Sequence, residues 1–246
     1  MAKIQCNVIS YTLQRTVDIT VVLPSVTIPE SMFEKDPHHD YSHKYPVLYL
    51  LHGFGNNNQT WTGYSNVEMY AEERQIAVVM FGAENKFYCN QPQDKFYDFL
   101  NQELPEYITQ VFPISTRPED TYIAGLSMGG FGALYHGLSN PEKFAAIGAF
   151  SAGLKLDGRP DCRVLAQKII DEKKTFPKMF ISIGDKDFLL ENNKDFHAFL
   201  EEKGVEHTWQ IVPGYGHEWR FWDQKVEEFL DWIQRSDFYA NKKRSV

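Results

Sequence analysis

Thr121-Tyr-Ile-Ala-Gly-Leu-Ser-Met-Gly-Gly-Phe-Gly132 is the stretch that decides the fold. Residues 120–124 are typical of a short buried strand, and residues 130–136 are typical of a helix with small side chains on its first turn. The pentapeptide between them, Gly125-Leu-Ser-Met-Gly129, has the pattern G-x-S-x-G. Between a strand and a helix, this pattern forms a sharp turn that strains the serine backbone and needs very small flanking residues. Ser127 is therefore the candidate nucleophile.

Strands and helices alternate along most of the chain. Residues 4–13 and 16–23 are β-rich and predict an antiparallel hairpin, whereas the polar residues 24–44 are interpreted as a long loop. From Tyr45 onward, six further strands are predicted at residues 46–51, 76–81, 121–124, 145–150, 178–183 and 207–212. Together these features predict an α/β fold, in which an eight-stranded, mostly parallel sheet carries helices on both faces. We expect residues 1–246 to form a single domain of the α/β-hydrolase type.

Two helices are predicted from local signals. The pattern Ser65-x-x-Glu68 is a capping box, which predicts the start of a helix that runs to about Arg74. Residues 94–111 have helical character, and Pro105 is expected to kink that helix.

The charge and the cysteines limit the partners and the compartment. A net charge of -8 argues against nucleic acid or an anionic membrane surface as a partner, and we interpret the basic residues 242–244 as a solvated tail. No run of apolar residues approaches the length of a membrane span, and the first residues lack the apolar core of a signal peptide. Three cysteines without a C-x-x-C pattern favour a reduced, cytoplasmic protein. Formation of a homo-oligomer is compatible with these features.

A serine nucleophile needs a base to accept its proton and an acid to orient that base. In α/β-hydrolases the three residues follow in the order Ser, Asp or Glu, His, each just after a strand. Ser127, Asp187 and His217 meet this order and placement. Asp185 lies at a similar distance from the preceding strand and stays open as an alternative acid, although the G-x-x-D spacing favours Asp187.

The sequence also predicts an oxyanion hole and a substrate pocket. His52-Gly-Phe-Gly55 follows a predicted strand and matches the H-G-x-G type of oxyanion loop. The backbone N–H groups of Phe54 and Met128 are therefore expected to hold the developing negative charge. Trp61 and Trp219 belong to a set of aromatic residues near these loops, and we expect both to line the acyl or alcohol pocket.

No metal and no organic cofactor is expected. The segment His38 to His43 contains three histidines, but adjacent histidines point apart on an extended chain and no cysteine or carboxylate pattern completes a ligand set. This segment is interpreted as solvated loop. Neither a dinucleotide-binding nor a Walker motif is present.

The chain resembles the esterase D-like branch of the α/β-hydrolases, and within it the bacterial tributyrin esterases. The matching stretches are residues 50–56 with Trp61, residues 66–68, Phe112-Pro113, residues 121–132 and residues 150–153. The resemblance implies hydrolysis of short acyl esters, with Ser127, Asp187 and His217 at the triad positions of the family.

The expected activity is therefore that of a serine carboxylesterase, which takes a small-molecule ester as its partner and forms an acyl-enzyme. The same superfamily contains feruloyl and acetyl-xylan esterases, S-formylglutathione hydrolases and acyltransferases. These activities stay open as alternatives at this point.

Overall fold

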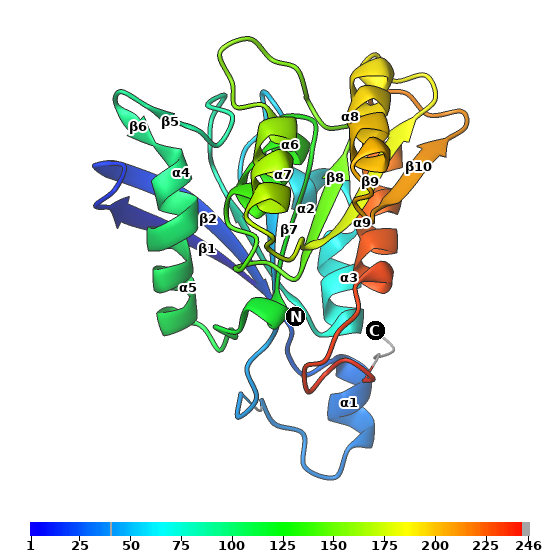
Figure 1. The fold of residues 1–246 in the computed structure, drawn as a ribbon. Helices are drawn as coiled ribbons and strands as arrows, with labels where there is room; N and C mark the ends of the chain where they lie inside the picture. Colours follow the sequence, from blue (N-terminus) through cyan, green and yellow to red (C-terminus); the bar gives the residue numbers. More distant parts are fainter. Residues whose placement is uncertain (40, 243–246) are drawn as a thin grey trace.

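An eight-stranded sheet forms the centre of the structure, which is a computed structural model that describes residues 1–39 and 41–242 (Figure 1). The strand order is β1-β2-β4-β3-β7-β8-β9-β10. The strands are β1 (Ala2–Ser10), β2 (Arg15–Leu23), β3 (Val47–Leu51), β4 (Ala77–Phe81), β7 (Thr121–Leu126), β8 (Ala146–Phe150), β9 (Lys178–Gly184) and β10 (Thr208–Val212).

The direction of each strand agrees with the hydrophobic pattern of its sequence. β2 runs antiparallel to both of its neighbours, β1 and β4, while every other adjacent pair in the sheet is parallel. Parallel strands are covered on both faces, so their sequences are continuously apolar, as β3 and β4 are. β1 instead alternates between exposed and half-buried residues, as expected for a strand at the edge of the sheet. The predicted fold class is confirmed.

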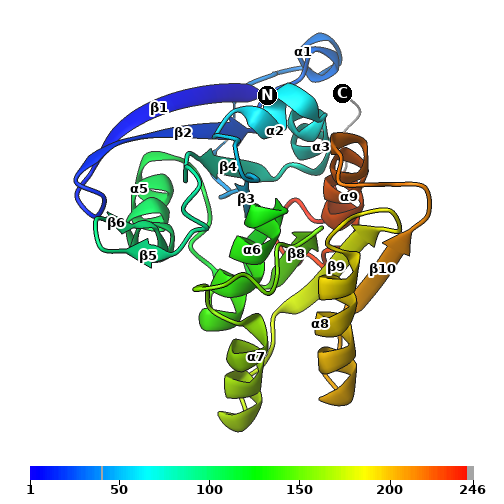
Figure 2. The ribbon, with the colours of Figure 1, turned by 90° about the horizontal axis from the view of Figure 1, so that it is seen from above.

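Helices cover both faces of the sheet, as seen from above in Figure 2. One face packs against α5, α6, α7 and α8, and the other against α2, α3 and α9. The helices are α2 (Thr60–Tyr64), α3 (Val67–Arg74), α4 (Phe96–Asp98), α5 (Leu104–Val111), α6 (Met128–Ser139), α7 (Cys162–Asp171), α8 (Leu190–Glu202) and α9 (Trp219–Trp232). A small hairpin of β5 (Asn90–Gln91) and β6 (Asp94–Lys95) and the short helix α2 are additions to the predicted elements.

The interpretation of residues 24–44 as loop is wrong in part, because helix α1 spans Ile28–Phe33. Thr27 forms a capping box with Glu30: the Thr27 hydroxyl accepts from the Glu30 N–H, and the Glu30 carboxylate accepts from the Thr27 N–H. Pro29 lies in the first turn, where a missing N–H has no cost. The T-x-x-E pattern with an internal proline was the signal for this helix.

The capping box predicted at Ser65 does not form, although α3 begins close to the predicted position. The N-cap is Asn66, whose side chain makes no capping bond to the helix. Asn66 instead bonds Asp223 through both its backbone N–H and its side chain. The Ser65 hydroxyl donates to the Trp61 carbonyl, and Glu68 pairs with Lys3 at 2.7 Å. Tertiary partners outcompete the local cap.

Pro105 changes the helical pattern rather than simply bending one long helix. Residues Phe99–Glu103 form a π-helical segment between α4 and α5, and Pro105 lies in the first turn of α5. A proline cannot bond the carbonyl four residues earlier, here that of Asn101. The Lys143 ammonium donates to this carbonyl at 3.0 Å. The π segment accommodates the proline while the freed acceptor keeps a partner.

The carboxyl ends of the parallel strands meet at one edge of the sheet, and the loops that follow them gather the candidate site. The described residues include no helix long and apolar enough to cross a membrane.

Candidate active site

Ser127 lies at a strained turn between β7 and α6. Its backbone has φ 53° and ψ −113°, a conformation in which the flanking chain must pass very close to other backbone. A Cβ on Gly125 would lie 2.5 Å from the carbonyl oxygen of Gly129, and a Cβ on Gly129 would overlap that of Leu51. Both flanking glycines of the motif are therefore required by the close approach of β3, which explains the G-x-S-x-G pattern physically.

Three side chains from different loops form a hydrogen-bonded chain. The Ser127 Oγ lies 3.0 Å from the Nε2 of His217, and the His217 Nδ1 lies 2.9 Å from a carboxylate oxygen of Asp187. Because the carboxylate can only accept, the proton of neutral His217 is on Nδ1, and Nε2 is free to accept the proton of the serine. The structure thus brings together the predicted nucleophile, base and acid in the geometry that a serine hydrolase needs.

Asp187 is buried but remains the stabilised, charged member of this chain. Burial raises its pKa, but hydrogen bonds from His217, from the Leu189 N–H at 2.9 Å and from Ser151 outweigh this effect, so that the pKa lies below its ordinary value. An ionised carboxylate at this position favours the imidazolium that forms when His217 takes the proton.

Asp185, the alternative acid, has a different role. Its carboxylate accepts from the Gly214 N–H at 2.7 Å, and its own N–H donates to the Val212 carbonyl. Asp185 therefore fixes the turn that leads from β10 to His217. The geometry favours Asp187 as the acid.

Ser151 is a residue that the sequence analysis did not select. It is fully buried after β8 with φ 49°, and its hydroxyl bonds the Asp187 carboxylate and accepts from the Trp222 indole N–H at 3.2 Å. The Trp222 ring also packs edge-on against the His217 ring, with centroids 4.8 Å apart. Ser151 thus bonds the candidate acid, and Trp222 packs on the candidate base. The sequence signal that could have identified Ser151 is its position directly after β8, the strand that pairs with β7.

The predicted oxyanion loop packs directly against the nucleophile. A Cβ on Gly53 would lie 3.6 Å from the Cβ of Ser127, so the backbone just before Phe54 passes close to the Ser127 side chain. Met128 is the first residue of α6, where a backbone N–H has no partner within the helix. Within the described parts of the chain, the N–H groups of Phe54 and Met128 donate to no other group. Their position and availability suit the predicted oxyanion hole.

His52 fixes the conformation of this loop through hydrogen bonds. Its Nδ1 donates to the Gly53 carbonyl at 2.8 Å, and its Nε2 accepts from the Ala83 N–H at 3.0 Å. The Tyr88 hydroxyl donates to the His52 carbonyl at 2.8 Å. Burial lowers the pKa of His52, which keeps the ring neutral and the bond from Ala83 intact.

The prediction that Trp61 lines the substrate pocket does not agree with the structure. Its side chain is 0% exposed, and its indole N–H donates to the Leu51 carbonyl at 3.0 Å. Trp61 therefore belongs to the core beneath the site, because a buried indole needs such an acceptor. Trp219 is half-buried at the outer side of this aromatic cluster and stacks on Tyr64. Its contact with substrate stays a prediction.

The described histidines of the segment 38–43 are exposed and have separate neighbours: His38 bonds the Asp36 carbonyl, His39 stacks on Tyr41, and His43 stacks on Phe238. Among the described residues, a different group lies close enough together to hold a metal ion: His197, Glu201 and His207. The sequence analysis did not consider these three together.

The fold and the geometry define a serine hydrolase of the α/β-hydrolase class, and comparisons with known proteins agree. The model of the family named "Esterase" matches residues 10–233, and the chain belongs to this family. An acetyl esterase of Caldicellulosiruptor saccharolyticus is 31% identical over 96% of this chain and 99% of its own length.

Two solved structures from Staphylococcus aureus are similar over 94% of this chain and 98% of theirs. The fluorophosphonate-binding serine hydrolase FphF has a TM-score of 0.84 at 30% identity, and an S-formylglutathione hydrolase has a TM-score of 0.82 at 29% identity. The protein is an enzyme that hydrolyses carboxylic esters.

We expect Ser127→Ala to lower ester hydrolysis by about 10⁴-fold or more while the protein stays folded, because the substitution removes only the attacking oxygen. The measurement is kcat/KM on a p-nitrophenyl ester, with circular dichroism as the check on folding. A folded variant that keeps a tenth of the wild-type rate would remove Ser127 from the mechanism.

Asp187→Asn is expected to lose about 10³-fold or more in kcat, because the amide cannot stabilise the imidazolium and favours the wrong tautomer of His217. Asp185→Asn is the matched control, since its amide oxygen can still accept from Gly214. It should keep most of the activity. If the two losses were reversed, Asp185 would be the catalytic acid.

Ser151→Ala is expected to lower kcat roughly tenfold through the loss of a hydrogen bond to a buried charge. The hydrogen bond from Ser151 lowers the pKa of Asp187, so its loss leaves the buried carboxylate less well stabilised and raises that pKa. Ser182→Ala is the control, since this buried serine makes no side-chain hydrogen bond within the described residues. A kcat for Ser151→Ala that equals the wild-type value would contradict the role of Ser151.

Proposed function

We propose that the enzyme hydrolyses short acyl esters of small alcohols through a Ser127 acyl-enzyme. The observation that carries this proposal is the chain of hydrogen bonds from Ser127 through His217 to Asp187. In the first step the Ser127 Oγ attacks the ester carbonyl as its proton passes to the His217 Nε2. The N–H groups of Phe54 and Met128 hold the oxyanion.

The second half of the cycle uses the same groups. His217 returns the proton to the departing alcohol, which leaves the acyl group on Ser127. A water molecule then attacks this acyl group, with His217 again as the base, and the carboxylic acid leaves. No step needs a metal or an organic cofactor.

Two exposed aromatic side chains flank this machinery and support a preference for small acyl groups. Phe188 is 77% exposed and its ring lies 4.6 Å from the His217 ring, while Phe54 is 60% exposed on the oxyanion loop. The loop after β8 lies on a third side of Ser127. There the Gly153 N–H donates to the Ser127 carbonyl, and Leu156 packs close to Gly153. The acetyl esterase among the relatives is consistent with a substrate of this size.

Hydrolysis of a formyl thioester is a second candidate. The similar structure from Staphylococcus aureus is named an S-formylglutathione hydrolase and is 29% identical to this chain. Formyl is the smallest acyl group, so the same site geometry serves both candidates.

We also propose that the enzyme is a single domain and works in the cytoplasm. The sheet is continuous and includes strands from both ends of the chain, which supports a single domain. Cys6, Cys89 and Cys162 are free thiols, and burial raises the pKa of each, so they are inert rather than reactive. Thiols of this kind suit a reducing compartment.

A panel of p-nitrophenyl esters from acetate to decanoate tests the acyl preference. We expect kcat/KM to be highest between acetate and butyrate and to fall steeply beyond roughly six carbons, because a methylene that clashes with packed side chains costs more than its burial contributes. S-formylglutathione and methyl ferulate belong in the same panel, so that the thioesterase and carbohydrate-esterase alternatives are measured beside it.

A rate that keeps rising to decanoate would indicate an open apolar groove and contradict the short-acyl proposal. A strong preference for methyl ferulate would favour a carbohydrate esterase. Transfer of the acyl group to an added alcohol, in preference to water, would indicate an acyltransferase.

A further inference from the structure

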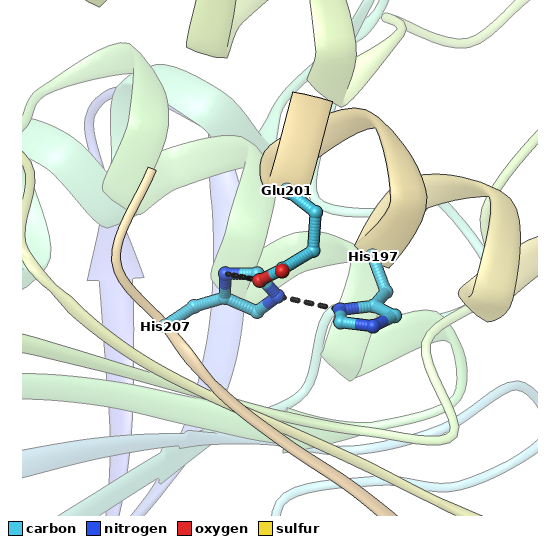
Figure 3. Close-up of side chains that lie close together, drawn as sticks. All are labelled: His197, Glu201 and His207. Atoms are coloured by element: carbon cyan, nitrogen blue, oxygen red, sulfur yellow. Dashed lines mark hydrogen bonds and ion pairs between the residues drawn. The ribbon is translucent and has the colours of Figure 1, made fainter. Parts of the chain in front are cut away.

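A second group of chemically capable side chains lies away from Ser127. His197 and Glu201 are four residues apart on α8 and therefore share one face of that helix. His207 immediately precedes β10 and points toward them (Figure 3). The three residues converge between the carboxyl-terminal half of α8 and the beginning of an edge strand.

The ligand atoms of this group are already close to one another. The His197 Nδ1 lies 2.8 Å from the His207 Nε2, and a Glu201 oxygen lies 4.0 Å from the other nitrogen of the His207 ring, Nδ1. One potential ligand atom from each residue falls within 4.8 Å of the other two. Two imidazoles and a carboxylate in this arrangement are donors that zinc accepts in proteins.

His207 is oriented as a metal-binding histidine would be. Its Nδ1 bonds the Val205 carbonyl at 2.8 Å, and since a carbonyl only accepts, the ring proton is on Nδ1. The lone pair of Nε2 therefore faces His197. A ligand histidine whose other nitrogen donates to a backbone carbonyl is the usual outer arrangement of a metal site.

His197 is also held in place. Its ring stacks on the Trp209 ring, with centroids 4.7 Å apart and planes within 10°. The His207 side chain is 0% exposed, whereas the Glu201 side chain is 64% exposed. The two rings are thus fixed by the protein, and an ion can enter from the side of the exposed carboxylate.

We propose that His197, Glu201 and His207 bind a Zn²⁺ ion, through His197 Nδ1, His207 Nε2 and the Glu201 carboxylate, with water as the fourth ligand. In this state neutral His197 carries its proton on Nε2 instead of Nδ1. Two nitrogens on a tetrahedral zinc ion lie about 3.3 Å apart. The histidine pair therefore opens by about half an ångström, within the reach of small side-chain rotations.

The site joins α8 to the edge strand β10, and its effect is on stability rather than on chemistry. α8 begins near Asp187 at the catalytic end of the sheet, and Glu201 lies about 16 Å further along the helix. His207 lies at the opposite end of β10 from the loop that carries His217. An ion bound there stabilises the folded state without contact with the triad.

Isothermal titration of the EDTA-treated, tag-free protein with ZnCl₂ tests the proposal. The expected result is one zinc ion per chain and a rise in Tm of about 5 °C at saturating zinc. His197→Phe keeps a ring to stack on Trp209 but has no ligand atom, so it should weaken zinc binding at least tenfold and abolish the rise in Tm. His39→Phe is the matched control, because it removes an exposed histidine outside the site.

Glu201→Gln gives a second measurement that does not depend on the histidine substitution. It should weaken binding at least tenfold, whereas Glu202→Gln, with the same loss of charge at the next position, should not. Absence of saturable zinc binding would overturn the proposal, as would equal affinities for His197→Phe and the wild type. Ester hydrolysis should be the same with EDTA as with zinc, and its loss in EDTA would contradict a site remote from the triad.

Discussion

The close approach of the turn around Ser127 to the end of β3 is the constraint on which the site depends. Gly125 and Gly129 lie very close to each other and to the Leu51 carbonyl. This approach is possible only because neither glycine has a side chain. The serine N–H donates to the Phe150 carbonyl, and the serine carbonyl accepts from the Gly153 N–H. Backbone bonds to β8 and its loop thus hold the strained conformation, and the strain exposes the hydroxyl to a base.

The same sheet edge fixes the partners of the serine. β8 and β9 are adjacent, so Ser151 at the end of one reaches Asp187 after the end of the other. β10 pairs with β9, and Asp185 ties the loop after β10 back to the loop after β9. His217 therefore approaches Asp187 because two parallel strands end together. The register of the paired strands, rather than any single strong bond, sets the distances within the candidate triad.

The parts of this protein that the sequence could predict are those encoded by local pattern. Continuous apolar runs in the sequence predicted the strands of the sheet. The order of Ser127, Asp187 and His217, each just after a predicted strand, predicted the candidate triad. α1 could also have been found, since Thr27 and Glu30 carry its capping box.

Other features depend on tertiary contacts that no local pattern records. The capping box at Ser65 does not form: the Glu68 carboxylate pairs instead with Lys3, 65 residues away in the chain. His197 and His207 meet only when α8 packs beside β10. Whether an aromatic residue faces substrate or core is likewise decided by what packs around it.

The aromatic residues near the site show why this last distinction matters for catalysis. Trp61 lies under the site and contacts Trp219, which contacts Trp222, and Trp222 in turn packs on His217 and bonds Ser151. Large rigid rings have few rotamers, so a cluster of them loses little entropy when it fixes its neighbours. Stabilisation of the oxyanion and the imidazolium requires groups that do not reorganise during the reaction. The buried aromatics therefore supply rigid support for the candidate triad, whereas the rings of Phe54 and Phe188 are exposed beside it.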